Sequence, residues 1–576
     1  MKGIVKLLFL CCTTAILMLC SSCEESLPPI SDTFSEQIRL NQIGYYPAAI
    51  KKAVIVDGPE TQKFMVVDSV AMNVLLTGTL SSAEDWKLAG ETVRIADFTK
   101  LTTPGTYLLL VPDLGYSYPF KIKKNVLHEA FLGSIKGLYY QRVGIPLKKE
   151  HAGKWHRDIA HLDDSIPFHP STGKTSGYIS SPGGWYDAGD YNKYIVNAAF
   201  PLGQFYLLQE QYPELVSDNM LNIPESGNGR SDYLDELKYE MDWALTMQDG
   251  DGGLFHKLTT KNFEGMVMPS AATSQRYIVG KGTTATLDFA ACAAQAYRVF
   301  KTVDSAYAEK CLTAAKKAYD WAMENPAVAF TNPEDVHTGQ YGDADFEDEW
   351  FWANAELLVA TQDSVYRNNI KKKAIDFNFK AGESWTAYMR FLGMFTLLDN
   401  KEAISEPFYN SIKNGIIASA DRLVTSAQEL DYFQPIDDFH WGSNSDVLNA
   451  AMVMAQAYRL KGSPKYLIGV QQAMDYILGN NAMGVSYLTG FGDKTPMFIH
   501  HRQSAADGLE DPVPGLLSGG PNSRLQDVAG GAVYPENPVP MQSWVDQEPS
   551  YASNEICLNW NAPMTYVLGF LEHESD

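Results

Sequence analysis

The sequence predicts a mainly α-helical protein in which a small β-sandwich precedes a large helical domain. Three observations lead to this fold class. The 576 residues are 45% hydrophobic and 12% aromatic, enough for one large core and a smaller module. Short β-type runs separated by turn residues occupy residues 38–123. From residue 125 onward, apolar residues recur at three- and four-residue steps, the spacing of a helix with one buried face.

The chain opens with the features of an export signal at residues 1–22. Two lysines precede a mostly apolar run at residues 7–19, which is shorter than the roughly 20 residues that span a bilayer. The ending Cys20-Ser-Ser-Cys23 resembles a bacterial lipobox, which implies that Cys23 is acylated and becomes the mature N-terminus. The acidic pair that follows resembles the export signal of surface lipoproteins in Bacteroidota. We therefore expect an outer-membrane lipoprotein, displayed on the cell surface and held by its lipid alone.

A tether and a β-module follow the lipidated cysteine. Residues 23–37 are rich in Pro, Ser and acidic residues and lack periodicity, which predicts a tether. Residues 38–123 carry six short β-type runs whose spacing is typical of a small β-sandwich. The runs begin at Ala53, Phe64, Val74, Val93, Tyr107 and Tyr118.

The helical domain is predicted to extend from residue 125 to residue 576. Loops rich in Gly, Pro and aromatic residues, notably 176–193, 486–513 and 519–554, separate its amphipathic segments. Loops of that length in a compact domain are more often functional than incidental. The predicted helices are 127–140, 194–211, 232–248, 286–302, 305–324, 349–362, 404–426, 447–461 and 464–478.

The formal net charge of −23 argues against phosphate backbones and anionic bilayers as partners, because the summed field repels polyanions. We expect a monomer that binds a neutral ligand and no nucleic acid. Three scattered cysteines remain outside the lipoprotein signal, Cys292, Cys311 and Cys557. Their spacing predicts buried free thiols rather than a disulfide framework or a metal site.

The segment Pro182-Gly-Gly-Trp-Tyr-Asp-Ala-Gly-Asp-Tyr191 holds the first candidate catalytic residues. Asp187 and Asp190 lie three residues apart, with glycine before and between them, which suits a bent loop whose carboxylates face one cleft. Such a pair can hold and deprotonate a water, as the base of an inverting glycosidase must. Taken alone, the pair fits a solvated turn or a calcium loop better.

Two further motifs supply a histidine, an arginine and a second acid. In Ile499-His-His-Arg502, the His and Arg side chains can donate to sugar hydroxyls and to carboxylates. Sequence neighbours rarely share one metal, so we reject a zinc site there. In Tyr551-Ala-Ser-Asn-Glu555, the acid is framed by Tyr551 and Trp560, and a partly apolar pocket would keep Glu555 protonated as a proton donor. Aromatic faces also stack on sugar rings.

In this order and separation, the three motifs resemble those of glycoside hydrolase family 9, over essentially the whole mature chain. Residues 38–45 resemble the start of the immunoglobulin-like module that one branch of the family carries. Residues 223–228, 234–236 and 441–444 resemble internal landmarks of the family. The resemblance implies an (α/α)6 barrel of six inner and six outer helices, preceded by an immunoglobulin-like β-sandwich.

The resemblance also implies roles for individual residues. Glu555 matches the general acid, Asp190 the general base, and Asp187 the residue that positions the attacking water. We place His500 and Asp546 with these catalytic residues, since both lie in the family's signatures. The predicted substrate-binding residues are Arg502, Tyr551, Trp560 and, from a strip with Lys257 that resembles a sugar contact, His256.

Two departures from the family pattern concern cysteine. Cys557 stands where the signature prefers Ser, Thr or Ala. Val143 and Trp155 stand in a region where some relatives bind structural zinc through cysteines, so we expect that zinc site to be absent. Relatives also hold structural calcium, and the acidic run 343–349 is a candidate that a solvated face explains equally well. Catalysis itself is expected to need no cofactor.

Together these features predict inverting, endo-acting hydrolysis of β-1,4-glucan backbones, in cellulose-like chains, mixed-linkage glucan or xyloglucan. Two alternatives stay open. The first is an exo-acting β-glucosidase or glucosaminidase on the same scaffold, because the loops that would close a cleft end cannot be identified from sequence. The second is a surface lipoprotein that binds glycan without cutting it, although such a binder has no use for an acid and a base together.

Overall fold

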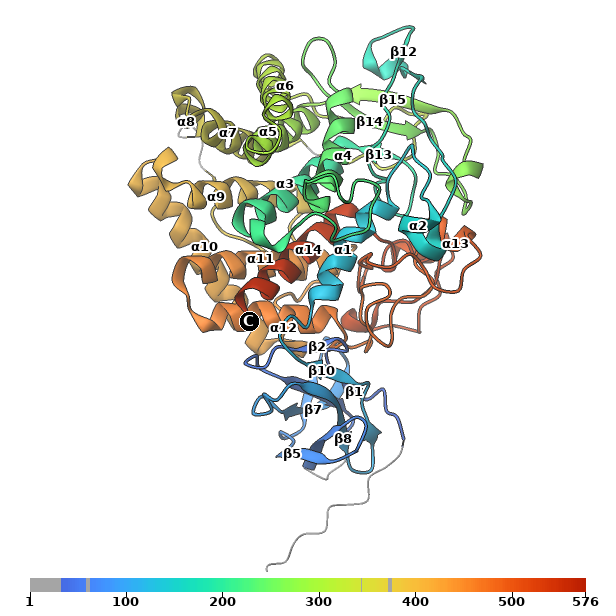
Figure 1. The fold of residues 1–576 in the computed structure, drawn as a ribbon, viewed down its shortest axis with the longest axis vertical. Coiled ribbons are helices and arrows are strands. Elements are labelled where there is room, and N and C mark those ends of the chain that lie inside the picture. The colour runs from blue at the N-terminus through green and yellow to red at the C-terminus, as the bar shows by residue number, and fades with distance from the viewer. Residues whose placement is uncertain (1–32, 59–62, 343, 371–374, 576) are drawn as a thin grey trace, which may run out of the picture.

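The computed structural model describes residues 33–58, 63–342, 344–370 and 375–575. The export signal, Cys23 and most of the tether lie outside these residues, as does Asp343, the first residue of the acidic run. Figure 1 shows a small β-module below a large helical body, with long loops gathered at one side of that body. No helix within the described ranges has both the length and the apolar character needed to cross a bilayer.

The β-module is a sandwich of two sheets. One sheet has the order β1-β3-β7-β6; the other has the order β2-β10-β8-β4-β5, with β9 paired to β8. Side chains from both sheets, such as Ile55 and Phe120, share one buried core. The strands are β1 (Ile38–Arg39), β2 (Gly44–Tyr45), β3 (Lys52–Val56), β4 (Lys63–Asp68), β5 (Val74–Thr79), β6 (Glu84–Trp86), β7 (Glu91–Asp97), β8 (Gly105–Val111), β9 (Gly115–Tyr116) and β10 (Phe120–Ile122).

The module begins earlier than predicted. Phe34, placed in the tether by its Pro- and Ser-rich surroundings, bridges to Tyr116 and packs 4.5 Å from the ring of Tyr118. The β-module therefore includes Phe34, which lies before the predicted tether boundary at residue 37. The sequence did not reveal this contact because a single aromatic residue carries no periodic signal.

Within the described residues, twelve helices of seven or more residues alternate between an outer and an inner ring along the chain. The inner helices are buried over almost their whole length: α3 (Ile195–Gln211), α5 (Thr283–Phe300), α7 (Glu347–Thr361), α9 (Met389–Asp399), α11 (Ser443–Lys461) and α14 (Leu558–Glu574). The outer helices of the described residues are α1 (His128–Tyr140), α4 (Asp232–Thr246), α6 (Ser305–Glu324), α8 (Ser364–Ile370), α10 (Glu406–Glu429) and α12 (Pro464–Ile477).

Contacts between neighbouring inner helices, with α10 packed on both α9 and α11, close the ring. Helix α3 packs on α5, α5 on α7, and α7 on α9, while α14 packs on both α11 and α3. Between two successive inner helices, an outer helix returns the chain to the end of the barrel where the next inner helix begins. This is the (α/α)6 barrel that the sequence predicted.

The prediction that the large domain is nearly all helical missed two small sheets. Strands β13 (Lys193–Tyr194), β14 (Phe255–Thr260) and β15 (Arg276–Lys281) form an antiparallel sheet over one end of the barrel, and β11 (Ile166–Pro167) pairs with β12 (Tyr178–Ile179). All six residues of β14 are buried, so the strand lacks the alternation that marks a half-exposed one. Short helices α2 (Lys149–Ala152) and α13 (Arg502–Ala506) lie in the loops.

The β-module is built into the barrel by polar and aromatic contacts. Asn41 donates to the buried carboxyl of Asp475 on α12 (2.8 Å), and the ring of Trp86 lies 4.9 Å from that of Tyr432. The carbonyl of Leu88 accepts from the amide of Met541, in the long loop that leads to Glu555. The module therefore supports a motif-bearing loop from behind.

Candidate active site

The three sequence motifs meet at the end of the barrel where the inner helices begin. This arrangement directs the N-terminal ends of the inner helices, with their unpaired amides, toward one cleft. The residues that precede inner helices and line the cleft are Asp187 and Asp190 before α3, Tyr341 before α7, Trp385 before α9, Trp441 before α11, and Glu555 before α14.

The cleft is a cavity of about 410 Å³ with mixed aromatic and acidic walls. A second cavity of about 230 Å³ continues from it, and the two share Trp385, Trp441 and Trp560. Indole faces of this kind suit the apolar faces of sugar rings. Of the predicted aromatic contacts, Trp560 lines the cleft, while Tyr551 stands at its edge, 5.2 Å from the ring of Trp441.

Backbone pairing fixes the motifs against one another. Ala188 bridges to Cys557, and His500 bridges to Glu555, so the loop of the two aspartates, the His-Arg motif and the acid form one small ladder. Gly189 lies at its centre, where a Cβ would stand 1.9 Å from the carbonyl oxygen of His500 and 3.2 Å from Glu555 Oε1. Only glycine permits this approach.

Asp190 has one oxygen occupied and one free. Its Oδ2 accepts from Asn192 Nδ2 (2.5 Å) and from the hydroxyl of Tyr194 (3.2 Å). Its Oδ1 is buried and has no hydrogen-bond partner within the described chain. Because Asp190 lines the cleft, that oxygen is placed to accept a proton from a water.

Asp187 differs, because donors occupy both of its oxygens. Asn197 Nδ2, on α3, donates to Oδ1, and the hydroxyl of Tyr341 donates to Oδ2, both at 2.7 Å. The same Asn197 amide lies 3.1 Å from the sulfur of Cys557. Burial raises the pKa of Asp187 well above its usual value, and the neighbouring charge of Asp190 raises it further.

Glu555 is held as an acid. Burial is the main cause that raises its pKa well above the usual value, followed by the charge of Asp190, whereas Arg502 and the backbone amide of Gly189 oppose the shift. A carboxyl in such surroundings keeps its proton at neutral pH. The cleft is thus lined by both a proton donor and an unpartnered carboxylate oxygen of Asp190.

The His-Arg motif supports these carboxyls. Arg502 is buried; its Nη1 (2.8 Å) and backbone N–H (3.0 Å) both donate to the carbonyl of Gly189. The Nδ1 of His500 lies 2.7 Å from the carbonyl oxygen of Glu548, which assigns the proton of the neutral ring to Nδ1. Burial lowers the pKa of His500 to about 4, so the ring is neutral near pH 7.

Two predicted site residues lie elsewhere. His256 and Lys257 are fully buried and do not line the cleft; His256 Nε2 instead donates to the carbonyls of Gln340 and Tyr341. Asp546 is not part of the cleft wall, because its two oxygens accept from the amides of Met497 and Phe498 at 2.8 Å each. Neither predicted side chain lines the cleft, because a motif position does not reveal which way its side chain points.

The structure also adds site residues that the motifs did not single out. Tyr194, Asn197 and Tyr341 hold the two aspartates, and Trp385 lines the cleft. They come from strand β13, helix α3 and the segments before α7 and α9, and none belongs to a motif singled out in the sequence. Trp441 had been noted only as part of a family landmark.

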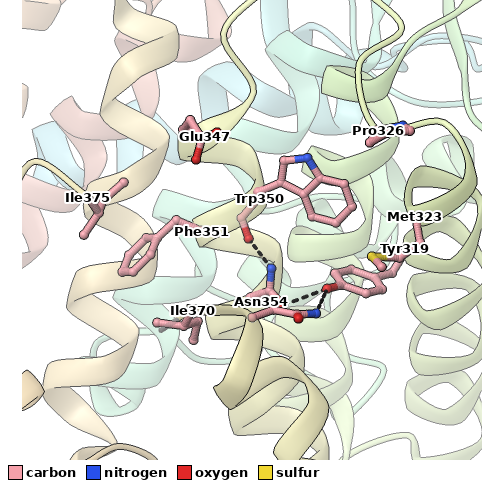
Figure 2. A pocket seen from close by; sticks show the side chains of 10 residues that line it. Tyr319, Met323, Pro326, Glu347, Trp350, Phe351, Asn354, Ile370 and Ile375 are labelled. Atoms are coloured by element: carbon pink, nitrogen blue, oxygen red, sulfur yellow. Dashed lines mark hydrogen bonds between the residues drawn. The ribbon is translucent and has the colours of Figure 1, made fainter. Parts of the chain in front are cut away.

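A further cavity, of about 280 Å³, lies away from these carboxyls between α6, α7 and α8 (Figure 2). Its walls are mostly apolar, with Trp350 facing Tyr319 and Met323 across the opening. The hydroxyl of Tyr319 donates to Asn354 Oδ1. Nothing in this cavity pairs an acid with a base, so it has no part in the chemistry of the cleft.

Metal binding finds no support in the described part of the chain, where no cluster of three or more His, Cys, Asp or Glu side chains could hold an ion. Cys292, Cys311 and Cys557 are buried free thiols, as predicted.

Comparison with known proteins places the whole described chain beside one group of enzymes. The profile of glycosyl hydrolase family 9 matches residues 128–568, and that of the cellulase N-terminal Ig-like domain matches residues 33–116. A xyloglucan-specific endo-β-1,4-glucanase of Bacteroides ovatus is 39% identical over 568 residues, covering 95% of each chain. Endoglucanase D of Acetivibrio thermocellus is 37% identical, covering 94% of this chain and 84% of its own. The solved structure of a Bacteroides ovatus family 9 hydrolase covers 94% of this chain and 100% of its own, at 37% identity and a TM-score of 0.87.

Proposed function

Since the chain belongs to glycosyl hydrolase family 9 and is an endo-acting β-1,4-glucan hydrolase, we propose that it cleaves with inversion, with Glu555 as the general acid and Asp190 as the general base. The observation that carries this assignment is the contrast between the two side chains. Glu555 is half-buried among groups that keep it protonated, while Asp190 presents a buried Oδ1 without a partner to the same cleft.

The reaction follows from that contrast. Glu555 delivers its proton to the glycosidic oxygen as the bond breaks, and Asp190 Oδ1 takes a proton from the water that attacks the opposite face of the sugar. Asp187, fixed by Asn197 and Tyr341, holds its carboxyl beside the base and orients the water. The indole of Trp560 supports the sugar ring next to the bond. This chemistry needs no cofactor.

Product stereochemistry tests the mechanism. One displacement by water on a β-linked chain yields the α-anomer first. Proton NMR of the anomeric signals, recorded before mutarotation mixes them, should show that anomer growing at the earliest times. Early appearance of the β-anomer would mean a retaining enzyme, and the roles of Asp187 and Asp190 would have to be reassigned.

We propose xyloglucan, a β-1,4-glucan with side branches, as the substrate. Two features support it. The Bacteroides ovatus relative named for xyloglucan matches 95% of this chain. The smaller cavity adjoining the cleft offers room for a side branch of the glucan chain. Reducing-end assays on xyloglucan, mixed-linkage glucan, glucomannan and carboxymethylcellulose should give the highest kcat/KM on xyloglucan. A preference for an unbranched backbone would overturn this substrate and leave the mechanism standing.

Endo action has its own readout, because internal cuts lower the viscosity of a polymer long before many reducing ends appear. An exo-acting β-glucosidase would release single sugars with little early change in viscosity. A glycan binder would produce no new reducing ends at all.

We also propose that the enzyme is a monomer anchored at the outside of the outer membrane by lipid on Cys23. The support is the lipobox-like sequence and the acidic pair that follows it. A Cys23→Ala variant should leave the membrane fraction, and protease added to intact cells should digest the wild type. Retention of the variant with salt-washed membranes would refute the lipid anchor.

A further inference from the structure

Lys257 is a buried ammonium beneath the active site that no carboxylate touches. Its side chain is fully buried, and its nitrogen donates to three neutral acceptors: Asn332 Oδ1 (2.7 Å), Thr338 Oγ1 (3.1 Å) and the carbonyl of Gly339 (2.8 Å). No ion pair with Lys257 occurs within the part of the chain that the structure describes. Placing an unpaired charge in a protein interior is costly, so its retention calls for a compensating field.

One side of Lys257 leads to Asp190. In the β13–β14 pair, Lys257 stands directly opposite Tyr194. The ammonium lies 5.5 Å from the centre of the Tyr194 ring, and the hydroxyl of that ring donates to Asp190. The tyrosine that holds the proposed base is therefore seated against Lys257.

The other side leads to Asp187. The hydrogen bonds of Lys257 to Thr338 and Gly339 hold the loop that continues to Tyr341. That tyrosine donates to Asp187 at 2.7 Å. His256, the neighbour of Lys257 on β14, donates to two carbonyls of the same loop. Strand β14 thus sets the position of both tyrosines that bind the aspartate pair.

The charge of Lys257 acts on the same pair. Burial lowers the pKa of Lys257 to about 7, and the charges of Asp190 and Asp187 oppose that shift. Coulombic attraction is mutual, so the ammonium favours the ionised form of the carboxylates that stabilise it. Below neutral pH Lys257 is therefore charged.

We propose that Lys257 is a positioning residue of the active site, whose buried ammonium favours ionisation of the Asp187 and Asp190 pair while its hydrogen bonds fix the loop that carries Tyr341. This inference rests on the proposed acid and base, and it goes beyond them by assigning a part to a residue that touches neither substrate nor reacting atom.

The pH dependence of the pair depends on several groups around it. Besides Lys257, the titratable side chains that interact with the two aspartates from the surrounding elements are Tyr194, Glu240, Tyr341, Glu555 and Cys557. Another cation, Arg502, acts on Glu555 and donates to the carbonyl of Gly189. Removing the charge of Lys257 therefore removes one identified positive contribution to the electrostatic field at Asp190.

The test is the pH profile of kcat/KM on soluble β-1,4-glucan for the full chain and two variants. Lys257→Gln removes the charge and keeps an amide that can donate to the loop, whereas Lys257→Met removes both. We expect the acidic limb to move up by about one pH unit in both variants, the low end for a single nearby charge. Lys257→Met should also lose roughly tenfold in kcat at the optimum, because its loop is loosened.

Two matched controls separate charge from structure. Lys261 lies just beyond the end of β14, and its half-exposed side chain pairs with Asp335. Lys261→Gln removes this positive charge and should leave the acidic limb of the pH profile in place. Thr338→Val removes one acceptor of Lys257 and keeps the charge, so it should lower kcat without moving the limb.

The inference is overturned if the acidic limbs of folded Lys257→Gln and the wild type coincide. Should Lys257→Met fail to fold, Lys257→Gln decides the question alone. Failure of the proposed function looks different, because the wild type itself would then show no bell-shaped profile or would release the β-anomer first.

Discussion

Gly189→Ala is expected to disable the enzyme through the backbone alone. An added Cβ would stand 1.9 Å from the carbonyl oxygen of His500, whereas ordinary contact begins at 3.4 Å. The aspartate loop and the His-Arg strand would have to separate by about 1.5 Å, more than the roughly 1 Å misplacement that costs 10²-fold in rate. The position of the added Cβ is fixed by the main chain of residue 189, and the atom that it meets is a main-chain oxygen, so no side-chain rotation relieves the clash.

Separation would also break what holds the site together. The carbonyl of Gly189 accepts from the backbone and from Nη1 of Arg502, and both hydrogen bonds would lengthen. We expect kcat to fall by at least about 10²-fold, with a loss of roughly 1–3 kcal/mol in the free energy of unfolding, as overpacked sites show. Reducing-end kinetics and thermal melts measure the two effects.

Gly250→Ala is the matched control, since its Cβ would meet no atom within 4 Å. It should retain the kcat and melting temperature of the wild type. A Gly189→Ala enzyme with near wild-type kcat would refute the view that the backbone ladder sets the geometry of acid and base.

Three other changes test separate parts of the structure. Glu555→Gln should fold normally and lose about 10²–10⁴-fold in kcat on polysaccharide, and substantial residual turnover would remove Glu555 from the mechanism. Asp546→Asn can accept through one oxygen instead of two, so it should lower the melting temperature and reduce kcat less than Glu555→Gln does, without moving the pH profile; a shifted profile would return Asp546 to the chemistry. Burial raises the pKa of Asp475 to about 8, so the folded state binds the extra proton and loses stability as pH rises from about 4 toward 8. Relative to the wild type, Asp475→Asn should therefore gain up to about 1.4 kcal/mol per pH unit between pH 5 and 7.5, and parallel denaturation midpoints across that range would contradict the assignment.

The amphipathic helices were predictable because each has one buried face. The segment 305–324 was predicted with the bounds that α6 has in the structure, and 464–478 differs from α12 by one residue. Helix α9 was missed, and its eleven residues Met-Arg-Phe-Leu-Gly-Met-Phe-Thr-Leu-Leu-Asp are apolar nearly all round. Helix α14 was missed as well, whereas the equally buried inner helices α3 and α5 were predicted, so an inner position alone does not hide a helix.

The carboxyls of the site were predictable from motifs, whereas their surroundings were not. Asp187, Asp190 and Glu555 stand in segments dense with Gly and aromatic residues, and they do meet in one cleft. Their partners Tyr341 and Asn197 come from a loop and a helix with no motif of their own. Long-range packing brings these residues together, and one sequence does not encode that packing in any local pattern.

Closure of the helical ring makes the assembly of the active site depend on α14, the inner helix that follows Glu555. Asn197 on α3 reaches both Asp187 and Cys557, the residue that caps α14, across 360 residues of sequence. The proposed base, Asp190, is thus synthesised well before the proposed acid, Glu555, and a nascent chain that stops short of Glu555 lacks the pair. Such distant contacts form late in folding because so much chain must first be brought together. A molecule in which α14 has not yet packed into the ring can therefore hold the aspartate loop but not the complete proposed pair of acid and base.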